Sequence, residues 1–511
     1  MKKVEKAILR LKTLDEPACY SAADVVLDIL DEKPNLIEET VSKIIDVYFD
    51  AESRQRARLG RAMGYIGSKN AKMGSKIVTA FLDSSRNSEY FTRWHAVDAL
   101  GYIGQENPCI VVDAVPRLVE LLDPNSEVSS VRAAQALAEI GSSNPDIVRD
   151  AAPKLVDLLR KSKNLAVIMF ATAALGKIGC TFPELTVNGL SRIIPMLTSG
   201  ALKTGDGLEA AIDRKGLDHA HAMIVEALGE IGLGNPELVK EAVPVLVKLL
   251  VNHPNNVRAA AAKALGYIGF RSPDLVFDGV PKLVSLLNDN DPSVKDSAIE
   301  ALGFIGSQNP NPILNAVTQL ITKLDDPNPG IRAGVVSALG YIGSRSPELI
   351  TEILPRLIDM LSDAEGVVRE YSADAVGGIA AKNPELVSKA IPQLVRLLND
   401  SSRQFIRGWT ACAIGNLASI IRNNPEYLER AVPELMQVLA DRTAFNRICA
   451  AEALGKIGSP RSLQPLQKLL NEEAEHVVIL DRAFKWIKAK DVIMEAIERI
   501  AKRRAQEVAV S

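Results

Sequence analysis

Apolar residues recur every three or four positions through most of this chain, which is the spacing of one face of an amphipathic helix. The stretch 238–250, LVKEAVPVLVKLL, shows this pattern, and the stretch 257–269, VRAAAAKALGYIG, repeats it a few residues later. In the second stretch Val257, Ala261 and Leu265 share one face, which we expect to lie in the core. The pattern therefore predicts a chain of helices arranged in pairs.

The pairs repeat along the chain with a fixed period. The six residues ALGYIG occur three times without change, at 99–104, 264–269 and 338–343. Related copies of this motif end at Gly67, Gly104, Gly141, Gly179, Gly232, Gly269, Gly306, Gly343, Ala380, Ala418 and Gly458. Successive copies lie 37 to 40 residues apart, except for one gap of 53. This period indicates a repeat array, in which every pair of helices meets the same packing problem.

Turn-forming residues mark the ends of the predicted helices. First helices begin with asparagine, proline and an acid, as at 144–146 and 235–237, a combination that caps the free amides and suits the positive helix end. A second proline eight residues later predicts a kink within this helix. It stands at Pro116, Pro153, Pro244, Pro281, Pro355, Pro392 and Pro433. In the second helix, the closing glycine predicts a left-handed C-cap, and the glycine three residues earlier predicts the close approach of a neighbouring helix.

The repeat resembles the HEAT repeat over essentially the whole chain. The matching elements are the first helix with its proline, the VR…ALGxIG second helix and the short period. The first half of each unit also looks like an armadillo repeat, but the period is too short for the extra helix of that family. A basic residue early in the second helix also matches the HEAT family. It stands at Arg56, Arg93, Arg258, Lys295, Arg332, Arg369, Arg407 and Arg447, and is replaced by Ser130, Ile168 and His221 in three units.

The resemblance implies an all-α fold, a right-handed α-solenoid of about 13 stacked helical hairpins. We expect residues 1–30 to form an N-terminal capping pair, and residues 31–458 to form eleven HEAT-like repeats. Residues 459–511 are expected to add a last repeat and a C-terminal capping helix. The long gap contains an insert at about 198–213, which we expect to project as a loop between the two helices of one repeat.

Composition narrows the function classes. Sixty Lys and Arg residues against 63 Asp and Glu residues give a net charge of −3, which removes any global argument for binding nucleic acid or a membrane surface. The five cysteines, at 19, 109, 180, 412 and 449, form no CxxC pair and indicate reduced thiols in the cytoplasm. The charged start of the chain is not a signal peptide, and no apolar run is long enough for a membrane span, so we expect no membrane insertion.

Catalytic and metal-binding motifs are not recognisable. The deoxyhypusine hydroxylases, which share a similar scaffold, carry His-Glu pairs, whereas His95 and His221 here are each followed by alanine. Gly200 and Gly205 have the spacing of a phosphate-binding loop, but Asp206 follows in place of Lys-Ser/Thr. We therefore expect no catalytic residues, no metal and no cofactor, and we predict that the protein is not an enzyme.

The variable position of ALGxIG supplies the first candidate binding residues. In HEAT solenoids second helices line the concave side, so this row would run along the inner groove. Its aromatic members are Tyr65, Tyr102, Tyr267, Phe304 and Tyr341, and aromatic rings suit both packing between repeats and partner binding, which leaves the two interpretations open. The same face is predicted to carry Arg54, Arg58, Arg61 and His95 near one end, and Tyr371, Trp409 and Asn416 near the other. The insert adds Thr204, Asp206, Glu209 and Asp213.

These observations favour a non-enzymatic scaffold or adaptor that binds one or more protein partners along the concave groove. The first alternative is nucleic-acid or polyanion binding through the basic face that contains Arg54, Arg58 and Arg61. The second alternative is a metal-dependent enzyme of the HEAT-like kind. The basic row at the start of the second helices has two interpretations as well: a structural ladder that bonds acids or carbonyls of the adjoining repeat, or a row of phosphate ligands.

Overall fold

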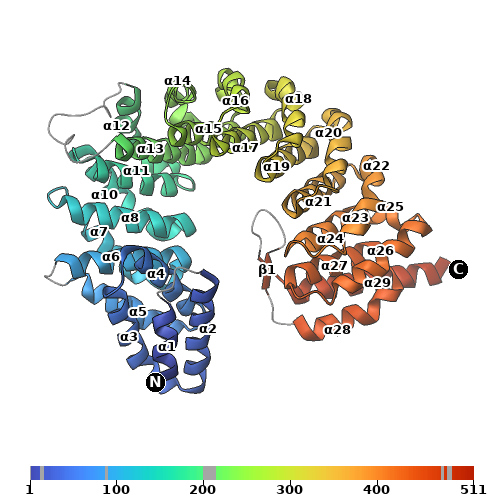
Figure 1. The fold of residues 1–511 in the computed structure, drawn as a ribbon, viewed down its shortest axis with the longest axis horizontal. Coiled ribbons are helices and arrows are strands. Elements are labelled where there is room, and N and C mark those ends of the chain that lie inside the picture. The colour runs from blue at the N-terminus through green and yellow to red at the C-terminus, as the bar shows by residue number, and fades with distance from the viewer. Residues whose placement is uncertain are drawn as a thin grey trace. The chain divides into compact units, whose positions relative to one another are not determined.

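The computed structural model describes residues 2–11, 16–86, 90–198, 214–473, 477–479 and 486–510. These residues are almost entirely helical, and they form two compact units, residues 1–275 (unit 1) and 276–511 (unit 2) (Figure 1). Each unit is a stack of helical pairs in which the second helix of one pair packs against the second helix of the next. This arrangement is the α-solenoid that the repeat pattern predicts.

Unit 1 begins with the helices α1 and α2, which pack against each other. Its second helices then stack in chain order, beginning with the contact between α2 and α4. They are α4 (Ser53–Lys69), α6 (Tyr90–Glu106), α8 (Glu127–Ser143), α11 (Leu165–Gly179), α13 (Arg214–Gly234) and α15 (Asn255–Arg271). The other α-helices of the unit are α1 (Lys2–Arg10), α2 (Glu16–Glu32), α3 (Ile37–Phe49), α5 (Ala71–Ser84), α7 (Val115–Glu120), α9 (Pro145–Val148), α10 (Ala152–Lys161), α12 (Val187–Thr198) and α14 (Val243–Leu249).

Unit 2 continues the same architecture. Its second helices are α17 (Pro292–Gln308), α19 (Pro329–Arg345), α21 (Gly366–Ala380), α24 (Ile406–Asn416) and α27 (Ala444–Ile457), and α29 (Ala489–Val510) packs against the last of them. The remaining α-helices are α16 (Val280–Leu286), α18 (Leu314–Thr322), α20 (Pro347–Met360), α22 (Pro384–Val387), α23 (Ile391–Leu397), α25 (Ala418–Arg422), α26 (Pro425–Val438) and α28 (Leu463–Glu473).

A short antiparallel hairpin interrupts the otherwise all-α chain near its end. The strands β1 (Val477–Ile479) and β2 (Trp486–Lys488) pair between α28 and α29, with Val478 opposite Ile487. The sequence analysis expects only helices in 459–511, so this hairpin is a local difference. Its strands are rich in β-branched and aromatic residues, which favour extended backbone.

The first helices are split more often than the sequence predicts. Around Pro116, Pro153, Pro244, Pro281 and Pro392, a 3₁₀-helix is followed by a short α-helix that has the proline in its first turn. Around Pro355 and Pro433 a single α-helix contains the proline. A proline lacks the N–H that a helix interior needs but suits a helix start, so a change of helix type replaces the predicted kink in most repeats.

The glycines of ALGxIG serve packing, and among the described copies only Gly458 caps its helix in the left-handed conformation. Helix α8 continues past Gly141 to Ser143, and among the described glycines only Gly458 has a positive φ, 82°. The predicted left-handed C-cap is therefore wrong for the other described copies of the motif. A Cβ placed on Gly340 would lie 2.9 Å from the Cα of Ala375, the alanine of the next motif copy. The helices approach so closely that only glycine fits, which explains why this motif recurs with little change.

Candidate functional site

The variable position of ALGxIG lies at the border between two successive second helices. Its side chain crosses the preceding second helix, since a Cβ placed on Gly60 would lie 2.5 Å from the Cβ of Tyr102. A Cβ on Gly176 would likewise lie 2.7 Å from a carboxylate oxygen of Glu230. The aromatic members of this row are half-buried. The row therefore contributes to packing between repeats and also presents part of each side chain to solvent.

The basic row at the start of the second helices is a structural ladder in unit 2. Arg332 donates from Nη2 to Asp363 Oδ1 at 2.8 Å, and Arg369 donates from Nε to Asp400 Oδ2 at 2.7 Å, each acid lying in the loop before the next second helix. Partial burial opposes ionisation of Asp363, but hydrogen bonds from Arg332 and from the backbone N–H of Glu365, together with the charges of Arg332 and Arg369, outweigh it and lower the pKa of this carboxyl. These contacts support the structural interpretation of the row over phosphate binding.

The residues predicted for the N-terminal basic face lie on α4 and α6. Arg58 and Arg61 are half-buried on α4, and the side chain of Arg54 lies outside the described part of the structure. The hydroxyl of Tyr65 donates to Asp24 Oδ1 at 2.7 Å. Burial, aided by the charges of nearby arginines, lowers the pKa of His95. The face is thus mixed in charge and partly tied to neighbouring helices.

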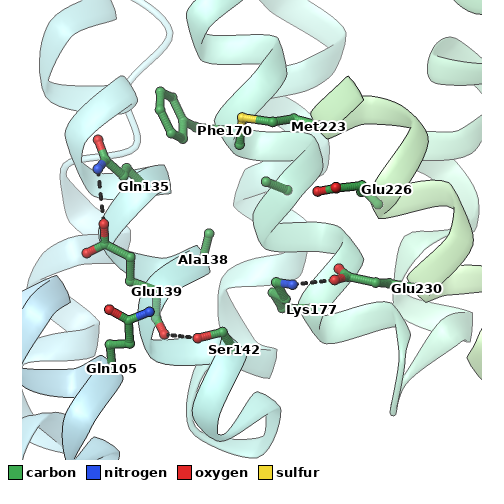
Figure 2. Close-up of a pocket in the computed structure, with 12 residues that line it drawn as sticks. Gln105, Gln135, Ala138, Glu139, Ser142, Phe170, Lys177, Met223, Glu226 and Glu230 are labelled. Carbon is green, nitrogen blue, oxygen red and sulfur yellow. Dashed lines mark hydrogen bonds and ion pairs between the residues drawn. The ribbon is translucent and has the colours of Figure 1, made fainter. Parts of the chain in front are cut away.

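A cleft of about 340 Å³ lies among the second helices α6, α8, α11 and α13 of unit 1, and we call it the ion-pair cleft (Figure 2). On one side Gln135 donates from Nε2 to Glu139 Oε1 at 3.0 Å, and on the other Lys177 forms an ion pair with Glu230. Phe170 and Met223 complete the wall between them (Figure 2).

Burial governs the electrostatics of the ion-pair cleft. It raises the pKa of Glu139 to about 7, against the opposing hydrogen bond from Gln135. Burial also raises the pKa of Glu230, although Lys177 opposes this effect, and it raises the pKa of Tyr102, on the same face, to about 12. Most of the charge in this cleft is therefore matched by polar partners within the chain.

A second cleft, of about 350 Å³, lies among α17, α19 and α21 of unit 2, and we call it the aromatic–acidic cleft. It brings together three predicted partner-binding residues, Phe304, Tyr341 and Tyr371. The rings of Phe304 and Tyr341 are tilted by 50° with centroids 6.3 Å apart, and Tyr371 is 39% exposed. The remaining walls include two carboxylates and two glycines: Asp296, Glu300, Gly330 and Gly334.

The other predicted site residues are dispersed. The ammonium of Lys263 lies 5.7 Å from the ring centroid of Tyr267 on the same helix, α15. Trp409 packs on Phe445 with ring centroids 5.0 Å apart. Asn416 donates from Nδ2 to the carbonyl oxygen of Gly377 at 3.1 Å, so it is engaged in contact with the preceding repeat. The insert residues Thr204, Asp206, Glu209 and Asp213 lie outside the described residues.

Two features are not predicted from the sequence: the acidic part of the aromatic–acidic cleft, and a basic cleft in unit 2. Gly330 and Gly334, four residues apart on α19, were an available signal for an open helix face. The basic cleft, of about 340 Å³, includes Arg422, Lys456, Arg499, Lys502 and Arg503. Arg503 donates from Nη1 to the carbonyl oxygen of Ile457 at 2.8 Å, so part of its charge serves the C-terminus of α27.

Two further features concern metals and membranes. Within the described ranges, no three His, Cys, Asp or Glu side chains cluster closely enough to hold a metal ion. None of the helices that the structure describes combines the length and apolar character of a membrane span.

Comparison with known proteins agrees with the repeat architecture. Three family profiles match: HEAT repeats over residues 243–319, the Adaptin N terminal region over 313–507, and the PBS lyase HEAT-like repeat over 92–124. No curated protein matches the chain.

Solved structures give a further comparison. Yeast importin-beta (Kap95p) is 14% identical, with a TM-score of 0.51 over 98% of this chain and 66% of its own. Kap121p is 14% identical, with a TM-score of 0.50 over 98% of this chain and 60% of its own. An engineered protein is 26% identical over 75% of this chain and 99% of its own, with a TM-score of 0.42. The profiles and the stacked helical pairs together show that this chain is a HEAT-repeat protein.

Proposed function

We propose that the protein is a non-enzymatic scaffold that binds a protein partner along the face formed by its second helices. The observation that carries this proposal is the aromatic–acidic cleft, where half-exposed rings from three successive repeats face the same space. Aromatic side chains give a large contact area at a small entropic cost, which suits protein recognition. The likeness in fold to importin-beta and Kap121p is compatible with such a role.

Binding of this kind is spread over several repeats. Each repeat contributes a few side chains, and affinity comes from the sum of weak contacts along the stack. Catalysis would instead need nucleophiles, acids or bases in close mutual geometry. The alternative of a metal-dependent enzyme is tested by metal analysis of the purified protein, where stoichiometric iron or zinc would support it.

The scaffold is tested by a tagged pull-down from native cells, with half of the material treated with nuclease. We expect a stoichiometric protein partner that survives nuclease and is lost from the variant carrying Tyr267→Ala with Tyr341→Ala. Far-UV circular dichroism and the melting temperature of the variant serve as the control. Lowered melting with intact binding would assign the tyrosines to packing, and the absence of any nuclease-resistant partner would contradict the scaffold.

Polyanion binding is the second candidate, and the basic cleft of unit 2 is the observation that favours it. Binding to nucleic acid would weaken steeply with salt, because each neutralised phosphate releases counterions. Reversal of Arg58 and Arg61 to glutamate tests the N-terminal face, and reversal of Arg422 and Lys502 tests the basic cleft. Unchanged retention on a heparin column in both variants would remove this candidate.

A further inference from the structure

One carboxylate of the aromatic–acidic cleft of unit 2, Asp296, has no matching cation among the described residues. The lining residues of the cleft include two carboxylates, Asp296 and Glu300, and no lysine or arginine. Asp296 makes no hydrogen bond and no ion pair with any residue that the structure describes. The wall of the cleft removes part of its water and raises its pKa, so a cation placed here would relieve an unfavourable environment.

The basic residues at the start of α17 and α19 are occupied elsewhere. Lys295, adjacent to Asp296 in sequence, directs its ammonium to Asp326 Oδ2 at 3.6 Å. Arg332, on α19, is held by Asp363 through two hydrogen bonds of 2.9 and 2.8 Å. The structural ladder therefore uses these cations and leaves the cleft acidic.

Another part of the cleft lining is aromatic. Phe304 and Tyr341 present tilted rings from neighbouring helices, and Tyr371 adds an exposed ring from the third. The faces of aromatic rings attract cations, and a carboxylate nearby adds a charge-assisted hydrogen bond. Gly330 and Gly334 have no side chains, so the surface of α19 leaves open space in the cleft, whose volume is about 350 Å³.

We propose that this cleft binds an arginine side chain of the partner protein, with the guanidinium hydrogen-bonded to Asp296 and the side chain lying against the aromatic lining of the cleft. This inference rests on the proposed scaffold function and names the chemistry of one of its contacts. Arginine fits better than lysine because its planar guanidinium stacks on rings and donates two parallel hydrogen bonds to one carboxylate. The cleft would thus be a specificity point within a longer interface.

The test uses the full chain and a defined probe, the pentapeptide acetyl-Gly-Gly-Arg-Gly-Gly-amide, observed by saturation-transfer NMR. The matched probe replaces arginine by citrulline, which keeps the shape and removes the charge. We expect saturable binding of the arginine peptide with a dissociation constant of about 1 mM or tighter, and at least about tenfold weaker binding of the citrulline peptide. The lysine peptide should bind with intermediate affinity.

Two variants locate the site. Asp296→Asn should weaken the arginine peptide about tenfold. Gly334→Leu should abolish binding by filling the cleft, since a Cβ there already comes within 3.0 Å of Asp296 Oδ1. Asp359→Asn, on the first helix α20, is the matched control and should change affinity less than about twofold. Circular dichroism establishes that all three variants are folded.

The outcomes separate this inference from the scaffold itself. Equal binding of the arginine and citrulline peptides, no saturable binding, or undiminished binding by Asp296→Asn would overturn the arginine site. In the pull-down, a nuclease-resistant partner recovered equally by wild type and Asp296→Asn would leave the scaffold standing and overturn the arginine contact. Loss of all such partners from the wild type would overturn the scaffold whatever the peptides show.

Discussion

The ion-pair cleft of unit 1 and the aromatic–acidic cleft of unit 2 are built from equivalent positions of the same repeat, yet they treat charge in opposite ways. In unit 1 the variable position of ALGxIG supplies Glu139, Lys177 and Glu230, whose carboxylates accept from Gln135 and pair with Lys177. In unit 2 it supplies Phe304 and Tyr341, while Asp296 stays without a partner among the described residues.

This difference in charge pairing indicates that the same repeat serves stability in one cleft and binding in the other. The Lys177–Glu230 ion pair is matched inside the chain, so it stabilises the stack and has little left to offer a partner. A carboxylate beside aromatic rings and without an internal cation lowers the stability of the fold slightly. Such a group is expected where it contributes to the binding of a partner. Substitutions in the ion-pair cleft should therefore mainly change folding, and substitutions in the aromatic–acidic cleft should mainly change binding.

The largest effect is expected from Lys177→Met in the ion-pair cleft. The variant leaves Glu230, whose side chain is only 18% exposed, without its ammonium partner. Loss of one member of a partly buried pair should lower the free energy of unfolding of unit 1 by about 3 kcal/mol. Hydrogen exchange of α11 and α13 measures this locally.

Two further variants control the Lys177→Met experiment. Lys240→Met removes an exposed pair with Glu237 in the same unit and should cost less than about 0.5 kcal/mol. Adding Glu230→Leu to Lys177→Met should recover much of the lost protection, because the uncompensated charge is then gone. Equal losses of unfolding free energy in Lys177→Met and Lys240→Met would show that the Lys177–Glu230 pair stabilises unit 1 no more than an exposed ion pair does.

The next largest effect concerns the stack that supports the aromatic–acidic cleft. Gly340→Ala would place a Cβ 2.5 Å from the Cβ of Ala375, and we expect a loss of about 2 kcal/mol from forced separation of α19 and α21. Gly378→Ala is the matched control, because a Cβ there meets nothing within 4 Å. It should instead stabilise α21 by up to about 1 kcal/mol through higher helix propensity. Hydrogen exchange in these two helices distinguishes the outcomes, and a loss at both glycines would contradict the packing argument.

The contrast between these glycines also marks how far the sequence could predict the fold. The period, the helical pairs and the close approach at Gly101, Gly303 and Gly340 follow from the repeated motif, because every copy poses the same local packing problem. The left-handed C-cap predicted at the closing glycine occurs at Gly458 and is wrong for the other described copies, whose glycines keep a negative φ and make room for their neighbours. The preference of glycine for helix ends predicted a cap, whereas packing between the second helices of successive repeats explains why glycine occupies these positions.

The candidate site was less predictable because it depends on three repeats at once. Phe304, Tyr341 and Tyr371 were found because aromatics are rare in this chain and fall on one helical face. Asp296 and Glu300 were not, because acidic residues on an exposed helix face are usually solvated and carry no signal in a single sequence. Only the structure shows that Lys295 and Arg332, close to Asp296, are already paired with other acids.

A pH-dependent effect of intermediate size is expected from Glu139. Its pKa rises from 4.5 to about 7 in the folded state, so the folded state holds the proton more tightly than the unfolded state. This stabilisation is complete below pH 4.5 and is lost as the pH rises through 7. Glu139→Gln, which mimics the protonated form, should match wild type near pH 4 and exceed its free energy of unfolding by about 1–2 kcal/mol at pH 8. Parallel pH profiles of the unfolding free energy in the two proteins would contradict this role of Glu139. The nearby charged groups Asp98, Arg61 and Arg132 are present in both proteins and do not remove the expected difference.

The smallest effect on stability is expected from Asp296→Asn, the counterpart of Glu139→Gln in the aromatic–acidic cleft. Asp296 makes no contact with a described cation, so its charge stabilises nothing inside the chain, and partial loss of water slightly disfavours it. The variant should unfold within about 0.5 kcal/mol of wild type, on the stable side at neutral pH, because the neutral amide loses less on desolvation. Urea denaturation at pH 7 measures this difference. A loss of 1 kcal/mol or more would mean that Asp296 stabilises the fold, as Lys177 does. The two clefts would then differ in composition but would both serve stability.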